Sequence, residues 1–439
     1  MSHQHTHHRK ARRTSIKLFT AMWCILSCIL LFFVFAQSTH AATRALLIGA
    51  DLKPQFVNLQ AMGKKQISFF DADRRLQIKS VNEVLQIRLL HSAESTRKAE
   101  TLSRSASDKI NEENVAARLP VRADLVDGQR LVSQWSDTID DGETLVFKHK
   151  LLGQTRVKLD VLARLWRDST KAHFAETPRT DTIALANGDV MTGFIVKLER
   201  DAVLVQIKGS KTPINLPLSR VAAVLLANPM THVASSNKPN GGDDDKTETG
   251  KHMIWLRDGS RLLSNKLEIG NDKLTIAPAM IAGRDVTISL TEVVRIEIAS
   301  TVGRLIDLTE LPYKVIAGGD VFGLKVPPRT VGSSLRLHAP VTLLITLPKG
   351  VTRFAGMAML DKQADRRWAS CVVKIRTGKQ VLGKHQLNAR TPNAQINILL
   401  GSAGSDRPPA MTIELDSGIN GPVMDRVWLR DAMLFVKSK

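Results

Sequence analysis

The sequence predicts a mainly β protein in which tandem small β units precede a larger β-sandwich. Apolar and polar residues alternate over short runs, which is the period of half-buried strands. Turn dipeptides recur at Asp127-Gly128, Asn187-Gly188 and Asp258-Gly259, and such turns between alternating runs are typical of β-hairpins. From residue 300 onward the alternating runs lengthen, Pro and Gly separate them, and no convincing helical period interrupts them. This pattern of longer strands separated by turns favours a β-sandwich.

Length and composition set the broad class. The chain has 439 residues, of which 43% are hydrophobic and 5% aromatic, enough for packed cores in roughly three domains. This composition argues against global disorder and against a fibrous fold. Two of the three cysteines, Cys24 and Cys28, lie near the start, so Cys371 is left alone. No disulfide framework is therefore expected.

Residues 18–36 form an apolar segment of 19 residues without a charge, and only basic charges precede it. This pattern is typical of an export signal. Because 19 apolar residues also nearly suffice to span a bilayer, residues 1–41 are predicted to be either a cleaved signal peptide or an N-terminal membrane anchor. Both interpretations stay open. The rest of the chain is expected to be exported, and to be periplasmic, membrane-anchored or extracellular.

The turn dipeptides belong to a repeat with a fixed layout. Leu131, Met191 and Leu262 each follow their turn glycine by three residues, and an apolar closing strand is marked by Val161, Val221 and Val293, which lie 33, 33 and 34 residues after the glycine. Such constant spacing indicates repeats. They are predicted over the ranges 121–167, 180–227 and 251–298. The range 42–92 has a similar rhythm without the turn, so a degenerate first copy is an open prediction.

Two polar segments separate these units. Residues 93–120 mix charges with Ser and are predicted to be a linker. Residues 228–250 are rich in Gly and Asp and lack an apolar period, so they are predicted to be disordered. The run Asp243-Asp244-Asp245 lacks the alternating spacing of a calcium loop, and no metal or other cofactor is expected.

The order of strands and turns in each repeat resembles the small SH3-like or Sm-like barrels found in tandem in exported planctomycete proteins. The alternating runs and turns within each repeat predict about four or five short strands. The alternative, in which the same hairpins form part of one larger β-sheet, stays open.

From residue 300 to 439 the order of motifs resembles the NPCBM/NEW2 domain, a carbohydrate-binding module associated with glycoside hydrolase family 98. The segments that carry the resemblance are LIDLTELPYKV, GSSLRLHAPVTLLITLPKGVTRFAGMAMLD, CVVKIRTGKQVL and DRVWLRDAMLF. The matching positions are Leu347, Pro348, Phe354, Gly356, Asp361, Asp425, Trp428, Asp431, Ala432 and Leu434. The resemblance implies a galactose-binding-like jelly roll. It supports the fold more than the ligand, because Thr377-Gly378-Lys379 replaces the family's Asp-Gly-Lys turn and the family's histidine is missing near 331–334.

Sugar-binding modules commonly stack a pyranose on an exposed aromatic ring. Among the six aromatic residues after residue 300, Phe354, Trp428 and Phe435 lie on alternating apolar runs and are predicted to be core. Trp368 is the best candidate for an exposed platform. Its alternative is ordinary packing at the start of a strand.

Charge points to a second means of recognition. Residues 300–439 contain 20 basic and 10 acidic residues, half of the chain's net charge of +20, and a concentrated basic surface attracts polyanions. The predicted site consists of Trp368, Arg366, Arg367, Lys374, Arg376 and Lys379, with Lys384 nearby. Scattered, solvated charges are the alternative. An acidic or sulfated glycan is the expected partner, and nucleic acid is excluded by the predicted export.

Catalytic signals are weak. The segment 378–384 has the spacing of a phosphate-binding loop, but His385 follows in place of Ser or Thr and the segment is a predicted hairpin. There is no His-Glu-x-x-His, Gly-x-Ser-x-Gly or Cys-x-x-Cys motif. The sequence therefore predicts a non-catalytic envelope protein that binds carbohydrate through its C-terminal module. The alternative is a structural scaffold that binds other envelope proteins through its repeats.

Overall fold

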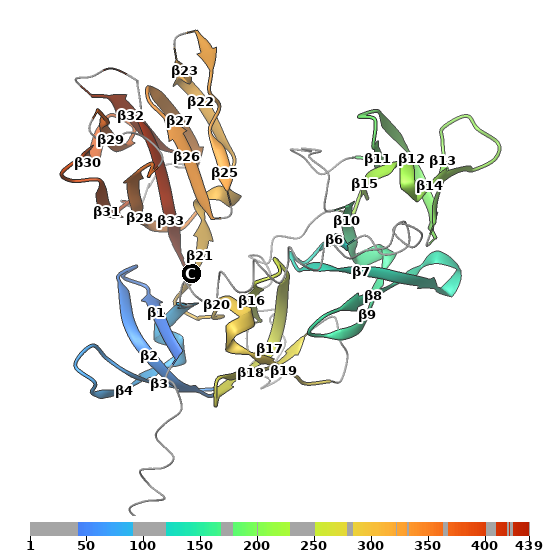
Figure 1. Ribbon diagram of the computed structural model, residues 1–439, viewed down its shortest axis with the longest axis horizontal. Coiled ribbons are helices and arrows are strands. Elements are labelled where there is room, and N and C mark those ends of the chain that lie inside the picture. Colours follow the sequence, from blue (N-terminus) through green and yellow to red (C-terminus); the bar gives the residue numbers. More distant parts are fainter. Residues whose placement is uncertain are drawn as a thin grey trace, which may run out of the picture. The chain divides into compact units, whose positions relative to one another are not determined.

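The computed structural model describes most of the chain after residue 42. The described residues are 43–90, 120–167, 179–199, 201–228, 251–278, 284–321, 323–331, 333–362, 368–400, 410–418, 421 and 425–438. The predicted signal or anchor, and nearly all of both predicted linkers, lie outside these ranges. The described ranges contain β-strands and short 3-10 turns but no α-helix, as Figure 1 shows. None of their segments is a helix long and apolar enough to cross a membrane.

Four units of five strands precede the C-terminal part. The first consists of β1 (Thr43–Gly49), β2 (Pro54–Met62), β3 (Gln66–Phe70), β4 (Leu76–Ser80) and β5 (Val84–Leu89). The second consists of β6 (Pro120–Leu125), β7 (Arg130–Ile139), β8 (Thr144–His149), β9 (Gly153–Lys158) and β10 (Leu162–Arg167). The third consists of β11 (Asp181–Leu185), β12 (Val190–Leu198), β13 (Ala202–Gln206), β14 (Ile214–Pro217) and β15 (Val221–Leu225). The fourth consists of β16 (His252–Leu256), β17 (Arg261–Gly270), β18 (Lys273–Pro278), β19 (Val286–Ser289) and β20 (Val293–Glu297).

Each unit is a small, partly open barrel. The first and last strands pair antiparallel in all four units, and a 3-10 turn precedes the last strand. The second strand of each unit contains a register shift that lets it bend from one neighbour to the next, as β-bulges do in small barrels. This arrangement confirms the predicted class of small tandem β-barrels.

The first unit lacks a glycine at its turn because Leu52 takes that place. The N–H of Leu52 donates to the carbonyl of Gly49, as that of Gly128 does to Leu125. Leu52 has the positive φ, 55°, that glycines adopt in the other three turns. The turn signature is therefore absent from the sequence although the turn itself is present.

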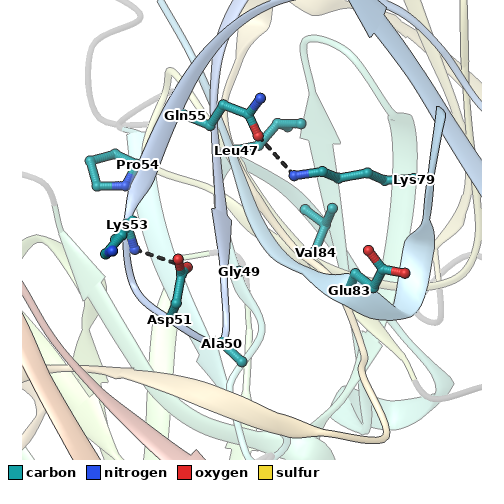
Figure 2. Close-up of a pocket in the computed structure, with 10 residues that line it drawn as sticks. All are labelled: Leu47, Gly49, Ala50, Asp51, Lys53, Pro54, Gln55, Lys79, Glu83 and Val84. Carbon is teal, nitrogen blue, oxygen red and sulfur yellow. Dashed lines mark hydrogen bonds between the residues drawn. The ribbon is translucent and has the colours of Figure 1, made fainter. Parts of the chain in front are cut away.

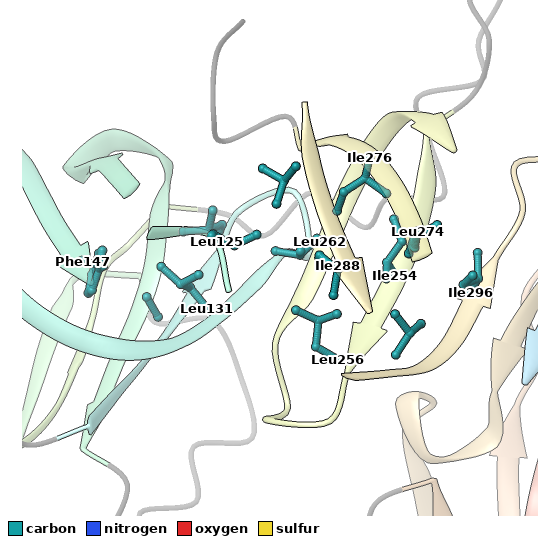
Figure 3. Packing of buried hydrophobic residues seen from close by; sticks show 14 of the residues in the cluster. Leu125, Leu131, Phe147, Ile254, Leu256, Leu262, Leu274, Ile276, Ile288 and Ile296 are labelled. Atoms are coloured by element: carbon teal, nitrogen blue, oxygen red, sulfur yellow. The ribbon is translucent and has the colours of Figure 1, made fainter. Parts of the chain in front are cut away.

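The cores of the units follow the alternation of the sequence. Figure 3 shows apolar side chains of the second and fourth units, among them Leu131 and Leu262, both fully buried. In the second unit the closing strand begins at Leu162, which is buried, and Val161 is 38% exposed. Val161 is the last residue of the 3-10 turn and lies directly before this strand.

Some units also share strand pairings. Strand β10 pairs with β15, which joins the second and third units edge to edge, and β20 pairs with β5. The alternative in which the hairpins form one larger β-sheet therefore applies to such pairings, which join one barrel to another.

The C-terminal part is a sandwich of two antiparallel sheets. One sheet has the order β25 (Arg329–Val331), β26 (Ser334–His338), β33 (Arg426–Lys437), β28 (Val351–Leu360) and β31 (Asn393–Leu399), and β21 (Gly303–Asp307) also pairs with β33. The other has the order β22 (Tyr313–Gly318), β27 (Val341–Thr346), β32 (Ala410–Ser417), β29 (Ser370–Thr377) and β30 (Gln380–Asn388). A short hairpin, β23 (Asp320–Val321) and β24 (Leu324–Lys325), follows β22.

The inner faces of both sheets form one apolar core. Phe354 and Leu434 from one sheet and Leu343 from the other are fully buried members of it. Phe354 lies in this core as predicted, whereas Phe435 is buried in a separate cluster with residues of the first unit. Trp428 is not in this core, and that prediction is wrong, because its strand neighbours on either side point inward and leave its ring half-buried on the outer face.

Candidate functional site

Several connections between the two sheets meet at one end of the sandwich. Strand pairing places Ser370 opposite Asn388 and Met359 opposite Asn393, so the segments before β29, after β28 and between β30 and β31 all emerge there. The N–H of Leu360 donates to the carbonyl of Pro392 (2.9 Å). We call this end of the sandwich, formed by residues 339–340, 361–362, 368–369, 389–392, 418 and 425, the Trp368 end.

A buried carboxylate anchors two of these connections. Asp425 is fully buried, and its oxygens accept from the backbone N–H groups of Ser370 (2.9 Å) and Gly418 (3.2 Å). Burial raises the pKa of Asp425, while these two hydrogen bonds oppose the rise. Asp425 therefore holds the start of β29 against the end of β32.

A second buried carboxylate fixes the end of β28. Asp361 is 4% exposed and accepts from Arg336 Nη2 at 2.7 Å. The guanidinium of Arg336 lies 5.4 Å from the centre of the Trp428 ring, within the range of a cation–π contact. Asp361, Asp425 and Trp428 are three of the positions that carry the NPCBM resemblance, and in this chain they stabilise loops and strands.

Trp368 is 60% exposed at the head of β29, so its predicted exposure is confirmed, while its role as a platform stays a prediction. Asn388, opposite Ser370, is the last residue before the turn that carries Arg390, and its side chain accepts from the N–H groups of Arg390 and Thr391 (both 2.9 Å). The Leu360–Pro392 hydrogen bond brings Lys362 to the same turn. Trp368, Arg390 and Lys362 are all exposed.

Lys362 and Arg390 did not enter the predicted site, because they lie 28 residues apart in the sequence. Only the adjacency of β28 and β31 brings them together. Within the described part of the chain, no ion pair occupies either side chain.

The predicted basic residues do not form one patch. Lys374 Nζ contacts the carboxylates of Glu414 and Asp416, and Arg376 Nε lies 3.0 Å from Glu414 Oε2. These two acids raise the pKa of Lys374. The positive charge on the outer face of β29 is therefore balanced locally by β32.

Lys379 lies at the other end of the sandwich. It follows Thr377, the last residue of β29, and an eight-residue strand is about 23 Å long from first to last residue. It therefore cannot share a compact site with Trp368. Lys384 is exposed opposite Lys374, while Arg366 and Arg367 lie outside the described residues.

The features of the described residues that bear on catalysis are metal-ligand groups, Cys371 and the segment 378–384. They contain no group of three or more His, Cys, Asp or Glu that could hold a metal ion. The thiol of Cys371 is buried, and burial raises its pKa to about 12, which is far from the range of a reactive thiolate. The segment 378–384 is part of the β29–β30 hairpin, as predicted.

The first barrel contains a small polar cavity of about 430 Å³, shown in Figure 2. Lys79 Nζ donates to Gln55 Oε1 at 2.8 Å, and the N–H of Lys53 donates to the Asp51 carboxylate at 3.1 Å. Glu83 completes a lining with two acidic and two basic side chains. The side chains of Lys79, Gln55 and Asp51 are thus already hydrogen-bonded within the barrel.

No family model and no curated protein matches the chain. Among solved structures it is similar to a CBM51 module of a Clostridium perfringens GH95 protein in complex with methyl-galactose, with 15% identity and a TM-score of 0.24, over 30% of this chain and 99% of that one. Tandem CBM51 modules of Sp3GH98 from Streptococcus pneumoniae give 10% identity and a TM-score of 0.25, over 89% of this chain and 88% of that one.

A third similar structure is CBM51-2 with INT domains of Clostridium perfringens ZmpB in complex with GlcNAc, at 12% identity and a TM-score of 0.26. It covers 40% of this chain, and the chain spans 38% of its length. All three structures contain carbohydrate-binding modules, and at such TM-scores they carry no argument about this chain. These structures name neither the NPCBM/NEW2 domain nor a planctomycete source, so both stay predictions.

Proposed function

We propose that the sandwich is a non-catalytic carbohydrate-binding module, and that the Trp368 end holds the glycan. The observation that carries this proposal is the exposed indole of Trp368 beside a turn with exposed basic and polar groups. An aromatic face binds the apolar side of a sugar ring, while neighbouring polar groups bind its hydroxyls. The buried Asp361 and Asp425 fix the loops that present these groups.

We further propose that the preferred glycan is acidic or sulfated. Lys362 and Arg390 lie at the same end of the sandwich as Trp368, and Arg366 and Arg367 adjoin it in the sequence. Arginine suits the paired oxygens of a carboxylate or sulfate because its guanidinium is a planar fork. Lys374 and Arg376 are left out of the proposed contact surface, because Glu414 and Asp416 already balance their charge.

Calorimetric titration of the full-length chain with heparin and with desulfated heparin tests both parts. We expect affinity for heparin to fall steeply as salt rises from roughly 50 to 200 mM. Binding releases counterions from the polyanion, and a higher salt concentration opposes that release. Trp368→Ala and Arg390→Ala should each weaken binding by roughly tenfold.

Lys379→Ala is the matched control, since it removes an exposed charge at the opposite end of the same sheet. Unchanged affinity is expected for it. Equal binding of both heparins would overturn the anionic preference. Absence of binding to any acidic or neutral polysaccharide at low salt would overturn the carbohydrate function.

The second candidate is an envelope scaffold, favoured by the strand pairings β10–β15 and β20–β5 that join neighbouring barrels. Pull-down from envelope fractions separates the two. A scaffold should keep its protein partners in the Trp368→Ala variant, whereas glycan-dependent capture should be lost. Export itself is a proposal that rests on residues 1–41, and N-terminal sequencing of the mature protein tests whether they are cleaved.

A further inference from the structure

The second and third barrels enclose a cleft of about 1220 Å³. Strands β8 and β9 with their flanking turns line one side, and strands β12 and β13 line the other. Pockets for single small molecules usually measure roughly 300–1,000 Å³. This cleft therefore has room for an extended ligand of several units. We call it the Phe194 cleft, after the largest exposed side chain in it.

Hydrogen bonds fix the two walls of the Phe194 cleft. Strands β10 and β15 pair antiparallel across the junction of the two barrels. The amide of Asn228 donates to the carbonyls of Leu159 (3.1 Å) and Leu162 (2.9 Å). Asp181, which also lines the cleft, accepts from the N–H groups of Ile195 (2.9 Å) and Ala227 (2.7 Å). The cleft is thus built by ordered strands.

Phe194 lies in this cleft with 66% of its surface exposed. It is on the solvent side of β12, since the next residue, Ile195, is 3% exposed and packs in the core. Its strand partner is Gln206, another residue of the cleft. A large apolar ring left exposed beside polar groups, in a cleft of this size, indicates a contact surface.

The charge of the Phe194 cleft differs from that of the chain. The chain carries +20, yet four acidic and three basic side chains line the cleft. The exposed acids are Asp140, Glu143 and Asp160. Among the residues that the structure describes, no ion pair ties any of these acids to a basic side chain. Their oxygens are available as hydrogen-bond acceptors, and the near balance of charge gives a polyanion no advantage.

We propose that the Phe194 cleft is a second glycan site, and that it takes a neutral oligosaccharide chain. The Phe194 ring supplies the stacking face for one sugar unit. The carboxylates of Glu143 and Asp160 and the amide oxygens of Gln206 and Asn228 accept hydrogen bonds from hydroxyl groups, since both amide nitrogens already donate to backbone carbonyls. This site is independent of the site for an anionic glycan proposed at the Trp368 end, because it lies on different domains and its acidic and basic side chains nearly balance.

Titration of the full-length chain with three neutral hexasaccharides, cellohexaose, chitohexaose and mannohexaose, tests the proposal. We expect at least one to bind, with an affinity that changes little with added salt. Phe194→Ala should weaken it by roughly tenfold, and Phe194→Trp should preserve it. Val190→Ala is the matched control, because Val190 is 55% exposed on the same strand but does not line the cleft.

Two readouts keep the outcomes distinct. The Trp368→Ala variant should bind the neutral hexasaccharide as the parent does, so failure of the sandwich site leaves this test intact. Thermal unfolding should be unchanged in Phe194→Ala, because the ring makes little core contact. Saturation by none of the three hexasaccharides at about 1 mM, or equal binding by Phe194→Ala and the parent, would overturn the proposal.

Discussion

Backbone conformation at single residues decides which turns can be recognised in the sequence. Gly128, Gly188 and Gly259 have φ values of 85°, 96° and 92°, which glycine adopts without steric cost. Leu52 adopts φ 55° at the equivalent turn, at a cost of roughly 1–2 kcal/mol. Its side chain is 2% exposed, and burial of a leucine, worth about 2 kcal/mol, offsets that cost.

Gly188→Ala isolates the conformational cost. A Cβ at this position would meet no atom within 4 Å, so the substitution should destabilise the third barrel by about 1 kcal/mol through backbone strain alone. Gly63→Ala is the control, since Gly63 has equal space and no positive φ. It should be neutral or slightly stabilising. Equal denaturation midpoints for the two variants would contradict this interpretation of the turn.

Asp124 in the second barrel is a buried carboxylate with several donors. It is 4% exposed and accepts from Arg122 (2.8 Å), Arg130 (2.6 Å) and Trp166 Nε1 (3.0 Å). Burial alone would raise its pKa, but the two guanidinium groups outweigh burial and lower it. The stability it contributes is therefore present above the pKa of the unfolded chain and is lost as the pH falls through the lower folded value.

Asp124→Ala should cost roughly 3–5 kcal/mol at neutral pH, because it leaves two partly buried cations without their partner. The measurement is chemical denaturation at pH 7 and at pH 3, and the cost should shrink at the lower pH. The exposed Asp137→Ala serves as a control from the same barrel. A cost that does not depend on pH would show that packing, rather than charge, accounts for the loss.

At the scale of strands and loops, local patterns predicted what the chain does over a few residues and failed where distant strands meet. Alternation and turn dipeptides placed the hairpins, because both signals are local. The pairing of Lys374 with Glu414 depends on the register of β29 against β32, 40 residues apart. The sequence therefore predicted a basic patch at the β29–β30 hairpin, but acidic side chains of β32 pair with two of its basic residues. For the same reason the sequence did not predict that Arg390 lies at the same end of the sandwich as Trp368.

Asp425→Ala tests whether the Trp368 end is held by its buried carboxylate. The variant leaves the N–H groups of Ser370 and Gly418 without their acceptor, so a loss of about 2–3 kcal/mol is expected. Hydrogen exchange should accelerate at these two amides first. Asp320→Ala, which removes an exposed carboxylate from the β23–β24 hairpin, should leave stability unchanged. Protection at Ser370 equal to that of the parent would exclude the anchoring role.

At the scale of the whole molecule, charged side chains lie where the first and fourth barrels pair. Glu297 of β20 lies opposite Gln86 of β5, whose amide reaches its carboxylate at 3.4 Å. Arg295 contacts both Glu297 (3.3 Å) and Asp307 (3.4 Å), and stacks over Trp255 at 3.9 Å. Burial raises the pKa of Glu297 to about 7, and Arg295 only partly opposes it.

The sign of the resulting pH dependence is set by this rise. The folded chain holds the Glu297 proton up to about pH 7, whereas an ordinary glutamate releases it near 4.5. Below 4.5 both states are protonated and stability is unaffected. Between pH 4.5 and 7 the carboxyl of Glu297 ionises in the unfolded chain but stays protonated in the folded one. This ionisation lowers the free energy of the unfolded chain, so the free energy of unfolding decreases as the pH rises. Since 26% of the side chain remains exposed, we expect a total loss of only about 1–2 kcal/mol.

Glu297→Gln should remove this slope, because glutamine keeps the shape and the hydrogen bond to Gln86 but cannot ionise. The free energy of unfolding, measured from pH 4.5 to 8 for the variant and the parent, should differ most at the highest pH, in favour of the variant. Glu268→Gln, an exposed position on β17 (44%), should keep the parent's slope. If Glu297→Gln is instead less stable above pH 7, the ion pair with Arg295 outweighs desolvation, and the carboxylate is charged where the two barrels meet.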